Sequence, residues 1–540
     1  MNSSIKSPGM TRLPDYPIHI KKAVFLLCSL FIVNILYAQK IAFRYPFKFT
    51  KKLTQSARLN KGAYIHLDTS KKQIALVLQD MNHTDYVLID SNMKTLSNFS
   101  LPAEKTIFGY QIEDRIRKYY SGAISDGNTY TFIFRKSTSN SEFTGRIAGF
   151  KYRQSFQKEV VDFRSKSVSQ HNYLSIPKEE DFISSFSQNN IFYAITALDE
   201  SSSLKIYTLS GDGKEDQKLV PFPLPSWPGK KTKKLSEVLD NTVLITEGEE
   251  TGLDDASLSS KLYITNESLV FVNDNLWGAH TVKISTSDFS VSSQTIKMEK
   301  NEQGKENDKT YTSCFKSGDF FYTVNLIDKS IYLEIHDSSG TKLKTIEINE
   351  LNIQSITNET GTYEEHKWSD VKSDPVDDFK KLLKAFRKGN LGITAEKRSN
   401  GNILVTIGTH DMLPIGSYSP GSSFTSVSSV PQGYGNHTTS TGNMIGPNLS
   451  LNIHRTTGIS SYSRDSEYYK STNFKLMLDG TKLTPVKVSI PESVADQVKR
   501  QIGDTGSGII SQFRFLGKEY LGYYESGADE YYFKQIKLKK

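Results

Sequence analysis

Short segments in which apolar and polar residues alternate recur along most of the chain. Three examples are Gln73-Ile-Ala-Leu-Val-Leu78, Ile191-Phe-Tyr-Ala-Ile195 and Ile331-Tyr-Leu-Glu-Ile335. A period of two over four to eight residues is typical of β-strands, and clusters of Asp, Asn, Ser and Gly between such runs are typical of hairpin turns. The pattern therefore predicts an all-β protein.

The alternating segments form a loosely repeated unit of apolar strand, short polar turn, second strand, tight hairpin and third strand. Asp and Gly supply the special backbone positions that tight hairpins need. Copies of the unit, each with its hairpin turn, are Ile74–Leu101 (turn at 90–92), Ile191–Val220 (211–213), Leu269–Met298 (287–288), Phe320–Ile348 (337–340) and Phe474–Ile490 (479–480).

This repeat resembles the outer strands of a β-propeller blade, where the chain turns back through an Asp/Gly hairpin. The resemblance covers most of the chain but is architectural only, because neither WD40 nor kelch signatures are present. It implies a single propeller domain over residues 39–540 with about seven blades. We place the blades at residues 61–101, 118–164, 182–222, 243–299, 311–349, 390–490 and 508–540.

The two ends of this domain both look like strands. Ile41–Phe49 and Tyr531–Leu538 are apolar and alternating, and pairing them inside one blade would close the ring and cover two free edges. The alternative is that Pro46 marks an ordinary edge strand.

Two short peripheral helices are expected between the strands. Asp374-Pro375 has the character of an N-cap and first helical residue, Phe379, Leu383 and Phe386 share one face, and Gly389 follows as a stop. The second helix is expected over residues 491–502, before Gly503.

The first 38 residues have the features of a secretory signal peptide. Lys21 and Lys22 precede an apolar run from Ala23 to Tyr37, and Ala38 stands at the expected cleavage site. A transmembrane anchor is the alternative, but the run is short of the roughly 20 residues that span a bilayer. Export would place the chain in the periplasm, on the outer envelope or outside a bacterial cell, with no membrane span in the mature chain.

Cleavage after Ala38 changes the charge and the cysteine count. It removes four basic residues and one acidic residue, so the formal net charge falls from +8 to +5. That near-neutral balance gives no reason to expect nucleic acid as a partner. Cys314 remains as the last cysteine, expected as a buried, inert thiol in a strand.

One long segment differs in composition from the rest. Residues 412–453 contain no Asp, Glu, Lys or Arg, whereas 23% of the whole chain is charged. We treat 412–470 as a Ser/Gly/Thr-rich loop insertion into the propeller. An uncharged loop with spaced aromatic residues suits contact with another surface; a flexible linker and a hairpin packed on its own propeller remain alternatives.

Linear motifs for catalysis are weak. Asp504-Thr-Gly-Ser507 resembles the core of an aspartic-protease motif, but that chemistry needs a second such aspartate, which the sequence lacks. The ten histidines show no metal-ligand spacing. The acidic segment Glu247–Asp255 lacks the spacing of a calcium loop, so we interpret it as a solvated loop. No catalytic residue, metal or cofactor is expected.

The function expected from these features is non-enzymatic. We expect an exported interaction or scaffold protein that binds an envelope protein or complex through its loops. The alternative is a carbohydrate-binding or carbohydrate-active propeller with its site at a central channel mouth, and converging ionisable groups from several blades there would favour an enzyme. The candidate binding residues, all aromatic or imidazole side chains in expected loops or at strand ends, are Trp227, Trp368, His410, Tyr418, Phe424 and Tyr434.

Overall fold

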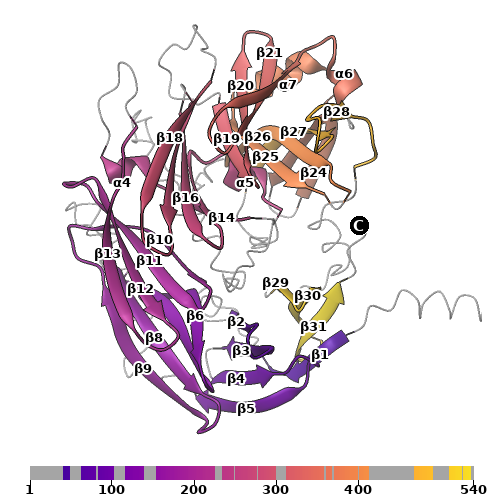
Figure 1. Cartoon of the computed structure of the whole chain (residues 1–540). Helices are drawn as coiled ribbons and strands as arrows, with labels where there is room; N and C mark the ends of the chain where they lie inside the picture. The colour runs from indigo at the N-terminus through magenta and orange to yellow at the C-terminus, as the bar shows by residue number, and fades with distance from the viewer. Residues whose placement is uncertain are drawn as a thin grey trace, which may run out of the picture.

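The fold is a ring of seven antiparallel sheets, or blades, as expected (Figure 1). A computed structural model describes residues 41–48, 62–80, 83–102, 116–138, 154–225, 234–247, 250–275, 278–298, 312–357, 361–367, 370–376, 378–398, 400–412, 468–490, 510–525 and 527–536. Within these residues, no helix has the length and apolar character needed to cross a membrane.

Blades 1, 2, 3 and 5 are simple four-stranded meanders. In each, the strands pair in chain order. Blade 1 contains β2 (Gly62–Asp68), β3 (Gln73–Gln79), β4 (His83–Ile89) and β5 (Thr95–Pro102); blade 2 contains β6 (Ile116–Asp126), β7 (Thr129–Thr138), β8 (Gln154–Asp162) and β9 (Ser167–Ser175); blade 3 contains β10 (Asp181–Gln188), β11 (Ile191–Leu198), β12 (Ser203–Ser210) and β13 (Glu215–Pro221); blade 5 contains β19 (Thr312–Ser317), β20 (Phe320–Ile327), β21 (Ser330–Asp337) and β22 (Lys342–Ile348).

Blade 4 has an additional strand at its inner edge. β14 (Val243–Thr246) runs parallel to β15 (Ser260–Ile264), and β16 (Ser268–Asn275), β17 (Gly278–Ser285) and β18 (Val291–Lys297) follow. Two four-residue helices flank β14, namely α4 (Leu235–Val238) and α5 (Leu253–Ala256). The expected solvated loop at Glu247–Asp255 is therefore wrong in part, because α5 begins inside it.

Blade 6 is the most elaborate sheet and corrects one prediction. Its strands are β23 (Gly361–Lys367), β24 (Asp370–Val376), β25 (Asn390–Lys397), β26 (Ile403–Met412), β27 (Tyr468–Leu478) and β28 (Pro485–Val486). The helix expected from Pro375 begins later, as α7 (Phe379–Phe386), with Asp378 as its N-cap. Pro375 instead lies in β24, the outer edge strand, where a missing N–H is tolerated. A further short helix, α6 (Ile353–Ile356), precedes the blade.

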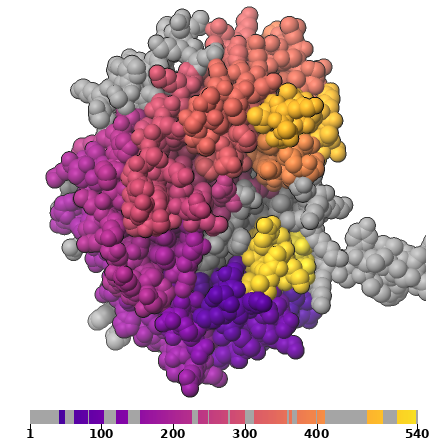
Figure 2. Space-filling view, viewed as in Figure 1, coloured from indigo at the N-terminus to yellow at the C-terminus, as the bar shows by residue number. Residues whose placement is uncertain are grey.

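Blade 7 joins the two ends of the described chain, which confirms the expected closure. It contains β29 (Ile510–Phe515), β30 (Lys518–Glu525) and β31 (Glu530–Ile536), and β1 (Ile41–Pro46) pairs with β31 as the outermost strand. Figure 2 shows the yellow C-terminal strands against the indigo N-terminal residues. Phe43 and Tyr45 of β1 are buried in a core that blades 7 and 1 share.

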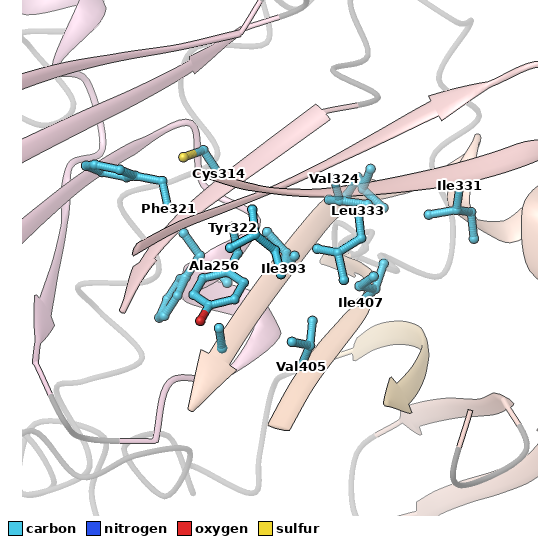
Figure 3. Packing of buried hydrophobic residues seen from close by; sticks show 14 of the residues in the cluster. Ala256, Cys314, Phe321, Tyr322, Val324, Ile331, Leu333, Ile393, Val405 and Ile407 are labelled. Atoms are coloured by element: carbon cyan, nitrogen blue, oxygen red, sulfur yellow. The ribbon is translucent and has the colours of Figure 1, made fainter. Parts of the chain in front are cut away.

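Apolar side chains between neighbouring blades form the core. Separate clusters join blade 7 to 1, blade 1 to 2, blade 2 to 3 and blade 3 to 4, and the largest one joins blades 4, 5 and 6. Figure 3 shows this largest cluster, in which Ala256 of α5 lies near Tyr322 of β20 and Ile393 of β25. Among the described residues, blades 6 and 7 share no such cluster.

Candidate functional site

The first strand of each blade lies nearest the centre of the ring, and its turn into the second strand faces one side of the molecule, which we call the A–B face. The turn from the second to the third strand faces the opposite side, the B–C face. Polar side chains link neighbouring blades along the A–B face and define the candidate site.

Asp68, Ser125 and Asn190 join blades 1, 2 and 3 on the A–B face. Ser125 Oγ donates to Asp68 Oδ2 at 2.8 Å, and the Asn190 amide both accepts from Ser125 N at 2.7 Å and donates to Ser125 O at 2.8 Å. Burial favours the protonated form of Asp68, but hydrogen bonds from Lys71, Ser70 and Ser125 outweigh that effect and hold its pKa well below the usual range. Asp68 is therefore a fixed negative charge, and the arrangement serves mainly to lock three blades together.

A cavity opens where the same face passes from blade 3 to blade 4. Gln188 Nε2 at the end of β10 donates to Thr265 O in the turn after β15, at 2.7 Å. Beside this bridge lies a cavity of about 170 Å³. Its lining combines hydroxyl, amide, carboxylate and aliphatic groups and consists of Ser187, Gln188, Leu244, Thr246, Glu247, Ile264, Thr265 and Asn266.

The rim of the cavity continues into blade 5 through an ion pair. Lys316 Nζ at the end of β19 donates to Glu247 Oε1 at 3.2 Å. The backbone N–H of Lys316 also donates to Tyr263 Oη of blade 4, at 3.0 Å. One carboxylate and one ammonium thus neutralise each other beside the cavity, which leaves its mouth suited to an uncharged, hydroxylated molecule.

Glu396 and Arg398 of blade 6 continue the A–B face. Arg398 Nη1 lies 3.1 Å from Glu396 Oε1. Burial raises the pKa of Glu396 to about 7, with Glu250 of blade 4 adding to the rise and Arg398 opposing it. A carboxyl group with a pKa near neutrality can hold or release a proton at physiological pH, which is the property that general acids and bases need.

The segment that carries α5 runs from this face into the space between blades 4, 5 and 6. It packs on two glycines that are paired across β25 and β26, Gly392 and Gly408. A Cβ at Gly392 would lie 3.2 Å from Leu253 O, and one at Gly408 would lie 2.8 Å from Leu253 Cδ1. Ser313 Oγ of β19 donates to Ala256 O at 3.1 Å. The two glycines therefore provide the flat surface on which α5 seats.

A second polar cluster is buried between blades 4 and 5. Lys261 Nζ donates to Asp274 Oδ2 at 2.5 Å, and Cys314 N donates to the same oxygen at 3.0 Å. The Lys261 side chain is 0% exposed and that of Asp274 is 3% exposed. Burial raises the pKa of both Asp274 and Cys314. Cys314 is thus a buried thiol in a strand, as predicted, and is not activated as a nucleophile.

The structure describes one of the six candidate binding residues. His410 lies near the end of β26, half-buried, where it is paired with Asn390 on one side and with Ser471 on the other. The other five candidates lie outside the described residues, as do the expected signal peptide, the helix at 491–502, the Asp504 motif and residues 413–467 of the insertion; the five are Trp227, Trp368, Tyr418, Phe424 and Tyr434.

Sequence patterns missed the ionisable groups of the A–B face. Glu247 and Glu250 come from blade 4, Lys316 from blade 5, and Glu396 with Arg398 from blade 6. They are single residues far apart in the chain, so no motif search could group them. In the part of the chain that the structure describes, no set of three or more His, Cys, Asp or Glu side chains is placed to hold a metal ion.

Comparisons with known proteins give the architecture but no family. No family model and no curated protein sequence matches the chain. Among solved structures, the β-propeller domain of the Trilobed protease from Pyrococcus furiosus is similar at 8% identity and a TM-score of 0.25, over 76% of this chain and 78% of that one. The WD40 domain of SCAP from fission yeast is similar at 6% identity and a TM-score of 0.24, over 92% and 97%.

A third similar structure is a mutant of Synechocystis ACO. The identity is 8% and the TM-score is 0.26 over 53% of this chain, and the match spans 61% of that protein's length. These values support no inference about function. The fold assignment rests on the sheets and their order.

Proposed function

We propose that this protein is an exported, non-catalytic interaction protein that binds a protein or protein complex of the cell envelope through loops of its B–C face. The observation that supports the proposal is how blade 6 holds the ends of the uncharged insertion. β26 and β27 pair without interruption from Ile403↔Leu478 to Met412↔Tyr469, where the insertion begins and ends. β23 pairs with the same end of β27, up to Lys367↔Tyr468.

This sheet is a rigid base for a long connection. Three paired strands fix the two attachment points of residues 413–467 at neighbouring positions, one strand spacing apart. The insertion itself lacks charge from 412 to 453 and carries Tyr418, Phe424 and Tyr434. The central parts of protein interfaces are likewise depleted in charge and enriched in aromatic residues.

The test is to replace residues 413–468 by Asn-Gly, which joins Met412 to Tyr469 through a two-residue hairpin turn. A matched control shortens residues 139–153, the connection between β7 and β8 on the same face of blade 2. We expect crosslinked recovery of the envelope partner to disappear in the first variant and to persist in the control. Both variants should keep the circular dichroism of the parent. Unchanged recovery by the insertion variant would refute the proposal.

Export is part of the same proposal and has its own test. Mass spectrometry of protein purified from the cell envelope or the culture medium should find an N-terminus at Gln39. A chain that retains residues 1–38 and stays with the cytoplasmic fraction would contradict export.

A carbohydrate-binding propeller is the second candidate function, and the A–B cavity favours it. Hydroxyl and amide groups surround an aliphatic floor there, and Glu396 provides a carboxyl group that could serve as an acid if the propeller also cleaves glycans. A glycan array should reveal binding that Gln188→Ala weakens, if the cavity is the site, or that Trp227→Ala and Trp368→Ala weaken, if loop tryptophans are. An array without binding would count against this function.

A further inference from the structure

The outermost strand of each blade has one edge that pairs with no other described strand. These seven edges are β5, β9, β13, β18, β22, β24 and β1. Proteins guard such edges with charged side chains or proline, because an open strand edge can pair with another chain. Comparing the seven edges shows which of them lack this protection.

Five of the seven edges carry charge. The charged residues on them are Glu215, Asp216 and Lys218 on β13, Lys297 on β18, Lys342, Lys344 and Glu347 on β22, Asp370, Lys372 and Asp374 on β24, and Arg44 on β1. β5 is uncharged but ends in Pro102. β9 has neither a charge nor a proline in its nine residues, SVSQHNYLS.

The side chains of β9 are satisfied within its own sheet. Gln170 accepts from Gln157 Nε2 at 2.8 Å and donates to Glu159 Oε1 at 3.2 Å, and His171 Nε2 lies 3.1 Å from Ser169 Oγ. The strand pairs with β8 from Ser167 to Ser175 on one side. What β9 still offers is therefore the backbone of its outer edge, framed by short uncharged side chains.

We propose that β9 is an interaction edge at which a second copy of this chain adds its own β9 in antiparallel orientation, so that two four-stranded blades form one eight-stranded sheet. Symmetric pairing about the middle of β9 places only Ser, Val, Gln, His, Asn, Tyr and Leu opposite one another, so no like charges meet. The same pairing of β13 would set Lys218 at the centre against its own copy. Charge thus selects β9, and self-pairing supplies a partner whose strand is known to be uncharged.

The strength of this contact follows from its size. A nine-residue strand is about 30 Å long, and with a contact width of about 10 Å the pair buries on the order of 600 Å² in total. Stable protein interfaces bury about 1,200–2,000 Å². The dimer is therefore weak, with a dissociation constant on the order of 100 μM, and forms at high local concentration.

The experiment measures self-association of the chain from Gln39 onward by sedimentation velocity between 1 and several hundred μM. We expect a reversible dimer, and hydrogen exchange of residues 167–175 that slows as the concentration rises. Ser169→Lys, on the exposed face of β9, should weaken association at least tenfold. Ser293→Lys, at an exposed position of β18, is the matched control and should leave it unchanged.

Each outcome decides the proposal. A chain that stays monomeric throughout, or a dimer that Ser169→Lys does not weaken, overturns it. Protection of residues 167–175 that appears only when a different protein is added also overturns it, because the occupant is then not a second copy. Circular dichroism of both variants shows whether a loss of association reflects the edge or a loss of fold.

Discussion

Glu396 should make the stability of the ring depend on pH, and its replacement by glutamine should remove that dependence. The folded chain raises the pKa of this carboxyl group from 4.5 to about 7, mainly by burial. Over that interval the folded state holds a proton that the unfolded chain has released. The contribution of Glu396 to stability is thus fully present below about pH 4.5 and is lost as the pH rises to about 7.

The size of the effect follows from the shift. Each pKa unit corresponds to about 1.4 kcal/mol, so the full loss is about 3 kcal/mol. The side chain is 25% exposed, so solvent screening makes this figure an upper value. A glutamine side chain has no proton to lose in this pH range, and Glu396→Gln should therefore be about 2–3 kcal/mol more stable than the parent at pH 8 and equal to it at pH 4.

The assay is urea unfolding followed by intrinsic fluorescence at pH 4, 6 and 8. Glu215→Gln is the control, because Glu215 forms an exposed ion pair with Lys158 and its loss should cost less than about 1 kcal/mol at any pH. Parallel pH curves for Glu396→Gln and the parent would refute the reasoning. They would mean that the carboxyl group is solvated and that the site on the A–B face is more open than the structure indicates.

Three further predictions concern the contacts that hold the blades together. Lys261→Met leaves the buried carboxyl of Asp274 without its counter-charge and should cost about 3–5 kcal/mol in denaturant unfolding, whereas Lys261→Met with Asp274→Leu should recover most of that loss; equal stability of the single and double variants would contradict this. Gly408→Ala places a Cβ 2.5 Å from Thr472 O and should lower the melting temperature, while Gly527→Ala, with open space around it, should not. A chain that lacks residues 39–46 loses the closing strand β1 and should aggregate on mild heating, which light scattering can detect; a monomer with the parent's melting temperature would show that closure is unnecessary.

Local turn chemistry explains why the blades could be predicted. Asp90 Oδ1 accepts hydrogen bonds from the backbone N–H groups of Asn92 and Lys94, and Asp337 Oδ1 does the same for Ser339 and Thr341. Each of these turns depends only on neighbouring residues, so its sequence is enough to identify it. The hairpins at the outer strands of blades 1, 3, 4, 5 and 6 all fall at predicted turns.

Long-range pairing explains the failures. Asp374 and Pro375 carry a strong local helix-start pattern, yet β24 continues through them because its partner β23 pairs with it up to Val376. The partner strand is selected by the whole blade, which no short sequence window contains. The ionisable groups of the A–B face could not be predicted for the same reason, since Glu247 and Glu396 approach the same face only after three blades have packed.

The pairing of β1 with β31 also sets an order in time. Phe43 meets Phe533, so the final blade cannot be completed until nearly the whole chain has been synthesised. A nascent chain therefore stays unclosed for as long as translation continues, and contacts between such distant segments form slowly. If export proceeds as proposed, this delay keeps the chain threadable until it has crossed the membrane, and the last strand to arrive finishes the ring on the far side.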